Sequence, residues 1–383
     1  MQDKQYLMIP GPTPVPPTVV AAMSKPIIGH RSEDFAALHK EIAGKLQKLL
    51  QTQNEVFVLT HSGTGAMETA VANTVSPGDK VLALVGGKFG QRFAQLARVY
   101  GGEVDEINFD WGKPVDLRIV EAKLAANPDI KVVLATQNET STGVTNDIQG
   151  LGKLVAQTPA LLVVDGVSGA GGIEIKVDEW NVDILCTGSQ KSMMLPPGLA
   201  IVTVSSKAWA VVDQNTSPRY YFSLPAARKS YAKWNTAYTP AVSLFVGLNA
   251  SLDMMLAEGF DNVFARHMLL KKATRAAIKA LGLRLLTDED CGSPVITSVL
   301  SPEGISADDI RKALKEEFGV TFAGGQDQLK GKLFRIAHMG FTDRMDVIIA
   351  IGALEMALNR VGYPVELGAG VKAAQEIFLG RNA

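Results

Sequence analysis

Short apolar runs alternate with helical patterns along the first half of the chain. The runs are rich in β-branched residues and apolar throughout, which is typical of strands buried on both faces of a parallel sheet. We expect such strands at 55–60, 80–86, 131–137, 160–167, 182–188 and 199–205. Helical patterns at 65–75 and 89–101 fit the crossover connections between parallel strands. The pattern therefore predicts an α/β fold with a mostly parallel central sheet flanked by helices.

The pattern changes after about residue 240. Helices are expected at 243–258, 262–281, 306–318 and 343–361, with strands at 293–301 and 332–338. This order predicts a large domain over 20–255 and a smaller C-terminal α+β domain over 256–383, to which 1–19 belong. The proline-rich "IPGPTPVPP" should run extended over the surface, either completing the small domain or reaching a partner subunit.

Composition narrows the class of protein. The 383 residues include 38 basic and 39 acidic side chains, a net charge of -1 that favours neither nucleic acid nor an anionic membrane. No apolar run approaches the roughly 18 residues of a spanning helix, and no secretory signal is visible at the start. The two cysteines and five scattered histidines show no metal-ligand spacing. We expect a protein of a reducing, cytoplasmic compartment without a metal site.

Candidate chemistry lies where the expected strands end, which is where open parallel sheets bind ligands. The turn "SGTG" at 62–65 follows a strand and opens a helix, so its free N–H groups and hydroxyls suit a phosphate. An ordinary helix cap with glycines for a tight turn is the alternative. The glycine spacing and the missing lysine exclude a dinucleotide fingerprint and a Walker loop.

Two charged residues follow neighbouring strands. Asp165 ends the apolar "LLVVD" and needs a partner if buried; a helix cap or structural ion pair would also supply one. Lys191 lies between apolar strands in "GSQKSMMLPPG", where burial could lower its pKa and make its amine a nucleophile toward carbonyls, although most loop lysines are merely solvated. Together, a phosphate turn, an acid and a lysine match pyridoxal 5'-phosphate: the lysine forms a Schiff base, the carboxylate keeps the pyridine nitrogen protonated, and the helix terminus holds the phosphate.

These segments resemble the class V aminotransferases of fold type I, most closely the alanine–glyoxylate and serine–glyoxylate (serine–pyruvate) group. The resemblance runs through "IPGPTPVPP", "SGTGAME", "GKFGQR", "NETSTGV", "LLVVDGVSGAGG", "GSQKSMMLPPG" and "FRIAHMG", which together span nearly the whole chain. It implies a homodimer with pyridoxal 5'-phosphate in active sites at the subunit interface.

The resemblance also implies residue roles. Lys191 and Asp165 are the catalytic pair, and Arg335 in "FRIAHMG" binds the substrate carboxylate with a planar fork suited to it. The other implied cofactor-binding residues are Ser62, Gly63 and Thr64 (phosphate), Phe89 (ring stacking), Thr140 and Ser141 (ring oxygen), Val167 (the opposite ring face), Gln190, and, from the neighbouring subunit, Tyr238 and Thr239.

The implied reaction is ping-pong transamination through a Lys191 Schiff base and pyridoxamine phosphate. No second cation is evident for a distal acid, so we expect alanine or serine as donor and glyoxylate or pyruvate as acceptor. A cysteine desulfurase-like lyase would need Cys186, in an expected buried strand, or Cys291 as its nucleophile. A redox partner subunit of a soluble hydrogenase is the non-catalytic alternative. His30, Arg31 and His61 could edge the site, but helix entry and strand ending explain them equally well.

Overall fold

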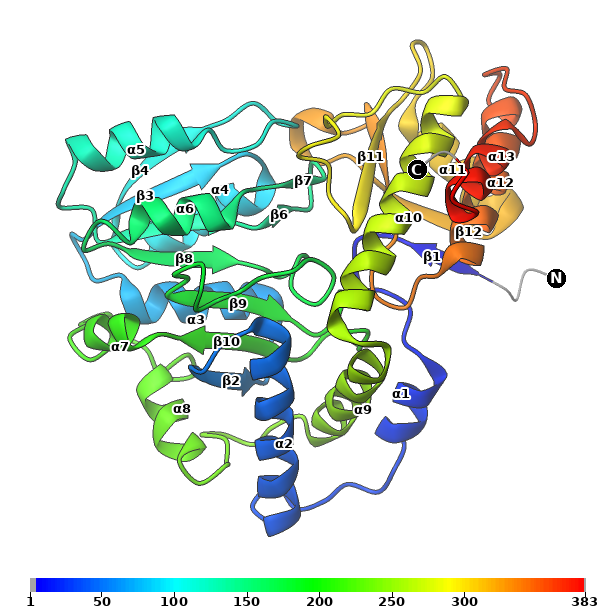
Figure 1. Ribbon diagram of the computed structural model, residues 1–383. Coiled ribbons are helices and arrows are strands. Elements are labelled where there is room, and N and C mark those ends of the chain that lie inside the picture. Colours follow the sequence, from blue (N-terminus) through cyan, green and yellow to red (C-terminus); the bar gives the residue numbers. More distant parts are fainter. Residues whose placement is uncertain (1–4, 382–383) are drawn as a thin grey trace.

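The computed structural model describes residues 5–381 and has two parts built on separate sheets (Figure 1). The larger part holds a seven-stranded sheet in the order β2-β10-β9-β8-β5-β3-β4, parallel except for β10, which is antiparallel to both of its neighbours. This confirms the predicted mostly parallel α/β sheet. The strands are β2 (Glu55–Leu59), β3 (Lys80–Val85), β4 (Glu103–Asn108), β5 (Val132–Thr136), β8 (Leu161–Asp165), β9 (Ile184–Gly188) and β10 (Ala200–Val204).

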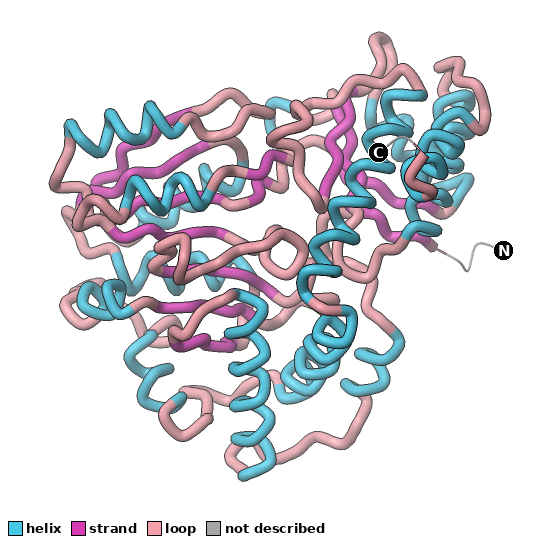
Figure 2. Tube along the Cα trace, viewed as in Figure 1, coloured by secondary structure: helices cyan, strands magenta, loops and turns pink. Residues whose placement is uncertain are grey.

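Both faces of this sheet are covered by helices (Figure 2). Alternate side chains of one strand enter different cores: Val163 packs on one face and Val164 on the other, which explains why the strands are apolar throughout. One core is closed by α2 (Glu33–Leu50), α5 (Leu117–Ala126), α6 (Ile148–Val155) and α9 (Val242–Glu258). The other is closed by α3 (Gly63–Thr74), α4 (Lys88–Val99), α7 (Ser206–Val212) and α8 (Leu224–Tyr231).

The smaller part has a four-stranded sheet in the order β1-β12-β13-β11, with its own apolar core. Its strands are β1 (Tyr6–Met8), β11 (Ile296–Leu300), β12 (Val320–Gly324) and β13 (Leu333–Ala337). The helices are α10 (Phe260–Ala280), α11 (Ala307–Phe318), α12 (Arg344–Arg360) and α13 (Ala369–Phe378). Figure 1 shows α10 running between the two parts. The small C-terminal sheet domain is thus confirmed; our proposed domain limits include residues 1–4 and 382–383, which lie outside the described residues.

The N-terminal segment departs from the expectation of a surface path. Strand β1, which directly precedes "IPGPTPVPP", pairs in parallel with β12 and completes the small sheet, whereas residues 9–17 themselves lie outside it. The chain then turns inward, and Pro10, Thr13 and Pro16 are buried. Thr13 binds the loop after β9: its N–H donates to Gln190 O (3.1 Å) and its Oγ1 to Lys191 O (2.9 Å). The segment leads on to α1 (Pro17–Met23), which packs against α9. The prolines predict correctly that this segment is not helical. They could not predict its burial, because that depends on contacts with the distant loop at 190–191.

Candidate active site

Lys191 lies in the loop between β9 and β10, beyond the carboxyl end of β9. Its Nζ donates a hydrogen bond to the carbonyl of Pro10. The N-terminal segment can approach this closely because Gly11 has φ +113° and no side chain; a Cβ there would lie 2.6 Å from Lys191 Cδ. Burial lowers the pKa of Lys191 to about 8, opposed by the charge of Asp165 and assisted by Arg335 and Arg92. The amine is therefore far more nucleophilic near neutral pH than that of an ordinary lysine.

Asp165 ends β8 and is 3% exposed. Its Oδ1 accepts a hydrogen bond from Val167 N–H at 2.8 Å. Burial raises the pKa of Asp165 to about 7; the bond from Val167 and the charge of Lys191 lower it, whereas the nearby Glu139 raises it further. A cationic group placed beside this carboxyl would favour its ionised form.

The turn after β2 begins α3 with exposed polar side chains. Ser62 is the N-cap residue, yet its side chain makes no capping bond, and Ser62 and Thr64 are exposed. Gly63 packs so tightly that a Cβ would lie 2.7 Å from Val167 Cγ1, which brings the turn and the end of β8 together. Thr64 Oγ1 accepts from Arg92 Nη1 (3.1 Å), and the guanidinium of Arg92 lies 4.9 Å from the centre of the Phe89 ring. These groups leave a positive helix end open to an anion.

Glu139 is a functional candidate that sequence reasoning missed. This carboxylate is 2% exposed and accepts four hydrogen bonds: from Phe89 N–H (3.0 Å), Gly90 N–H (3.1 Å), Ser141 N–H (3.1 Å) and Ser141 Oγ (2.5 Å). Burial raises the pKa of Glu139, and the donated bonds act in the opposite direction. Glu139 thus caps α4 and joins the start of that helix to the 140–142 loop. The only hint in the sequence was an acid inside a polar turn.

Arg335 on β13 is a buried cation, 6% exposed, that lies beside the 140–142 loop. Its Nη1 donates to Thr140 O (2.7 Å) and its Nε to Gly324 O (2.9 Å). Within residues 5–381, Nη2 donates no hydrogen bond and stays available to a ligand. Burial lowers the pKa of Arg335 to about 10, with the charge of Glu139 opposing. The side chain of Thr140 is turned to Ser168 Oγ (2.7 Å).

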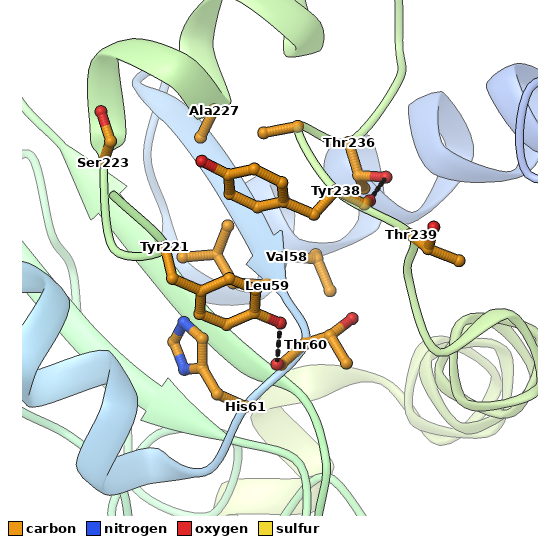
Figure 3. Close-up of a pocket in the computed structure, with 11 residues that line it drawn as sticks. Val58, Leu59, Thr60, His61, Tyr221, Ser223, Ala227, Thr236, Tyr238 and Thr239 are labelled. Carbon is orange, nitrogen blue, oxygen red and sulfur yellow. Dashed lines mark hydrogen bonds between the residues drawn. The ribbon is translucent and has the colours of Figure 1, made fainter. Parts of the chain in front are cut away.

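Tyr238 and Thr239 lie in the segment between α8 and α9. They line a pocket at the β2 edge of the sheet with Thr60, His61 and Tyr221 (Figure 3). Tyr238 stacks on Tyr221, with ring centroids 5.3 Å apart, and its hydroxyl donates to Tyr220 O. Within one chain, then, Tyr238 packs in an aromatic cluster with Tyr220 and Tyr221, and Thr239 lines the same pocket.

The remaining candidates are placed as follows. His61 lies over the start of α3, where its Nδ1 would be 2.5 Å from a Cβ on Gly65, and burial lowers its pKa. Arg31 Nη1 donates to Thr236 O (2.6 Å), so it fixes the loop that carries Tyr238; His30 precedes it, ahead of α2. Cys186 and Cys291 are both buried, and burial raises the pKa of each thiol.

The residues present suit pyridoxal 5'-phosphate. The α3 terminus offers donors for a phosphate, and Asp165 offers a buried carboxyl for a ring nitrogen. Gln190 Oε1 is buried without a hydrogen-bond partner in the described chain, which leaves an acceptor for a bound group. Residues 5–381 contain no group of three His, Cys, Asp or Glu side chains placed to hold a metal ion, and no helix among them is long and apolar enough to span a membrane.

Comparison with known proteins agrees with this arrangement. Residues 5–340 match the family described as aminotransferase class-V. The chain is 45% identical to a soluble hydrogenase small subunit from a Synechococcus species, over 99% of both chains. It is 43% identical to an L-aspartate–glyoxylate aminotransferase from Paracoccus denitrificans (99% of this chain, 97% of the relative). It is 40% identical to a serine–glyoxylate aminotransferase from Hyphomicrobium methylovorum (97% and 94%).

The fold is also shared with solved structures. The crystal structure of an alanine–glyoxylate aminotransferase from a Nostoc species superposes with a TM-score of 0.90 at 31% identity, covering 92% of this chain and 95% of that one. The family match covers most of the chain, and several relatives match from end to end. The chain therefore belongs to the class V aminotransferases, in the group that contains the glyoxylate aminotransferases.

Proposed function

We propose that the protein transfers an amino group from alanine or serine to glyoxylate or pyruvate with pyridoxal 5'-phosphate as cofactor. The observation that carries this proposal is that Lys191, Asp165 and Arg335 meet at neighbouring strand ends. Strands β8 and β9 are adjacent, and Arg335 donates to Thr140 O in the segment that follows β5, the other neighbour of β8. A nucleophilic amine, a carboxyl and a cation with a free N–H are the groups that amino-acid chemistry on this cofactor requires.

When bound, the cofactor supplies an electron sink for the bonds at the substrate α-carbon. Ser62, Gly63 and Thr64 would hold its phosphate, and Asp165 its ring nitrogen; Phe89 and Val167 would lie against the ring. Gln190, Thr140 and Ser141 would complete the contacts. These roles are supported by the open helix terminus and by the position of Asp165 at the end of β8.

The chain's own residues would perform the proton transfer. Lys191, with a pKa of about 8, has an appreciable uncharged fraction near neutral pH and can take the proton from the substrate α-carbon. Arg335 would hold the α-carboxylate through Nη2, while Nε and Nη1 remain fixed to Gly324 and Thr140. Since one arginine serves donor and acceptor alike, the oxo acid formed from the donor must leave before the acceptor binds, which makes the reaction ping-pong.

The proposal includes a homodimer. Tyr238 and Thr239 gather at the β2 edge within their own chain, and the exposed Thr239 is available to a second copy. We propose that this loop reaches the phosphate of the neighbouring subunit. Equilibrium sedimentation gives the subunit number, and a Thr239→Ala variant that binds cofactor as tightly as the wild type would count against this contact.

The alternatives are a cysteine desulfurase and a non-catalytic partner subunit. A cysteine desulfurase needs an accessible thiolate, and both thiols here are buried with raised pKa values.

The similarity to a soluble hydrogenase small subunit favours a second candidate, a partner subunit without its own catalysis. Colour separates the enzyme from the partner subunit. After pyridoxal phosphate is added and the unbound excess is removed, an enzyme of this kind keeps a visible absorbance band that borohydride removes, whereas a partner subunit is colourless.

The experiment that tests the proposal is a panel of amino donors against glyoxylate. Purified protein is loaded with cofactor and supplied with alanine, serine, aspartate or glutamate, and glycine formation is measured. We expect alanine and serine to give the highest catalytic efficiency. No glycine from any donor would refute the aminotransferase proposal, and a preference for aspartate or glutamate would refute the monocarboxylate assignment.

A further inference from the structure

An ion pair closes the rim of the site around Arg335. Lys88, the first residue of α4, extends its Nζ to Asp327 Oδ2 at 2.8 Å, and their side chains are 34% and 46% exposed. Asp327 begins a 3-10 turn (Asp327–Leu329) in the small domain, whereas Lys88 belongs to the large one. The pair therefore spans the two domains.

Hydrogen bonds place this pair beside the proposed substrate pocket. Lys88 N–H donates to Ser141 Oγ (3.0 Å), and the neighbouring Thr140 accepts from Arg335 at its carbonyl. On the other side Arg335 donates to Gly324 O, three residues before Asp327. These contacts form a closed ring. It runs from Lys88 to the 140–141 loop, then to Arg335, then to the 324–327 segment and back to Lys88. The unpaired Nη2 of Arg335 belongs to this ring.

Two other cations near the site contact different groups. Arg92 is bound to Thr64 Oγ1 and lies over the Phe89 ring. Arg311, whose charge reaches Arg335, donates to Asp308 and to Phe322 O. Lys88 differs, because its ammonium is a flexible point charge and its partner is a carboxylate of the small domain.

We propose that the Lys88–Asp327 pair determines substrate specificity, discriminating against amino acids with a distal carboxylate. The inference rests on the proposed transamination and names the residues that set its substrate class. Asp327 neutralises the ammonium of Lys88, which could otherwise attract a distal carboxylate, and itself repels that group. The side chains of alanine and serine are uncharged, so the ion pair neither attracts nor repels them. Repulsion of this kind lowers the affinity for the rejected substrate and changes the affinity for the accepted substrate little.

The test is the ratio of kcat/KM for aspartate to that for alanine, each with glyoxylate as acceptor. In Asp327→Asn, Lys88 loses its competitor, and we expect this ratio to rise about 10-fold because an attractive charge replaces a neutral pair. In Lys88→Gln the unpaired Asp327 should lower the ratio roughly 3-fold, and the double variant should return to within about 2-fold of the wild type. A ratio cancels general losses of activity.

The chain offers a matched control. Lys113 and Asp288 form another ion pair between the two parts of the molecule (2.7 Å; 58% and 69% exposed). Asp288→Asn should leave the ratio unchanged.

The outcomes are separable. If the wild type transaminates alanine but the ratio is unchanged in Asp327→Asn, the specificity proposal is wrong and the proposed function stands. A wild type that already prefers aspartate also overturns it. If no donor is transaminated, the proposed function fails and this inference fails with it. Should Asp327→Asn not fold, by circular dichroism, Lys88→Gln carries the test, and an unchanged or increased ratio in that variant overturns the proposal.

Discussion

Replacing Glu139 by glutamine tests whether this buried carboxylate organises the site. The side chain keeps its shape but loses one acceptor oxygen and gains an N–H₂ group. In the wild type, one oxygen accepts from Phe89 and Gly90, and the other accepts twice from Ser141. The best orientation of glutamine keeps its oxygen on the first pair and turns its amide nitrogen to Ser141. Ser141 Oγ can accept from that nitrogen, but Ser141 N–H then has no acceptor.

The magnitude follows from these bonds. A buried N–H left unpaired costs about 1–3 kcal/mol, and the bonds to Phe89 and Gly90 each lose about 1 kcal/mol when the acceptor is no longer charged. Relief of the carboxylate's desolvation offsets part of this sum. We expect Glu139→Gln to lower the free energy of unfolding by about 2–4 kcal/mol.

The assay is urea unfolding of the cofactor-free protein at fixed pH and salt. Glu103→Gln is the control, because Glu103 is exposed on β4, and a surface change of this kind should stay within about 0.5 kcal/mol. A loss of less than about 0.5 kcal/mol in Glu139→Gln would refute the role assigned to the four hydrogen bonds.

Three further predictions concern the charged residues of the site. In cofactor-free protein, the rate of reductive methylation of Lys191, followed by mass spectrometry against pH, should have a midpoint near the lowered pKa of about 8, and a midpoint above 10 would contradict the burial argument. Asp165→Ala should slow each half-reaction by about 10³-fold or more, since a preorganised charge contact is lost; a change under about tenfold would remove Asp165 from this role. Arg335→Ala should lower kcat/KM about 10²-fold for donor and acceptor alike with cofactor absorbance unchanged, and loss of cofactor with intact substrate affinity would make Arg335 structural.

Local patterns were enough to predict the central elements of the fold. Each expected strand from 55–60 to 199–205 has a counterpart in the large sheet, and the helices and strands expected after residue 240 are also present. Three of the missed strands are β1, β4 and β12. Strand β4 lacks the apolar signal, because it reads "EVDEIN" and lies at the sheet edge, where little of it is buried. Strand β12 reads "VTFAG" and is short. Strand β1 has only three residues and exists because β12 pairs with it.

The candidate site was only partly accessible to sequence reasoning. The strand-end rule places Asp165 and Lys191 at one edge of the sheet, since the carboxyl ends of β8 and β9 are adjacent. It could not show that Glu139 reaches a helix start 50 residues away, or that Pro10 accepts from Lys191, because such contacts are set by tertiary packing. It also missed that Lys88 has a partner in the small domain.

The central claim is that Lys191 bonds covalently to pyridoxal phosphate and carries transamination. The most direct measurement is to incubate purified protein with pyridoxal phosphate, reduce it with borohydride, digest it, and locate the modified lysine by mass spectrometry. The account predicts one pyridoxyl phosphate group per chain, on Lys191, with loss of the visible absorbance and of alanine-dependent glycine formation. Modification of other lysines with Lys191 untouched, or normal turnover by Lys191→Ala, would contradict it.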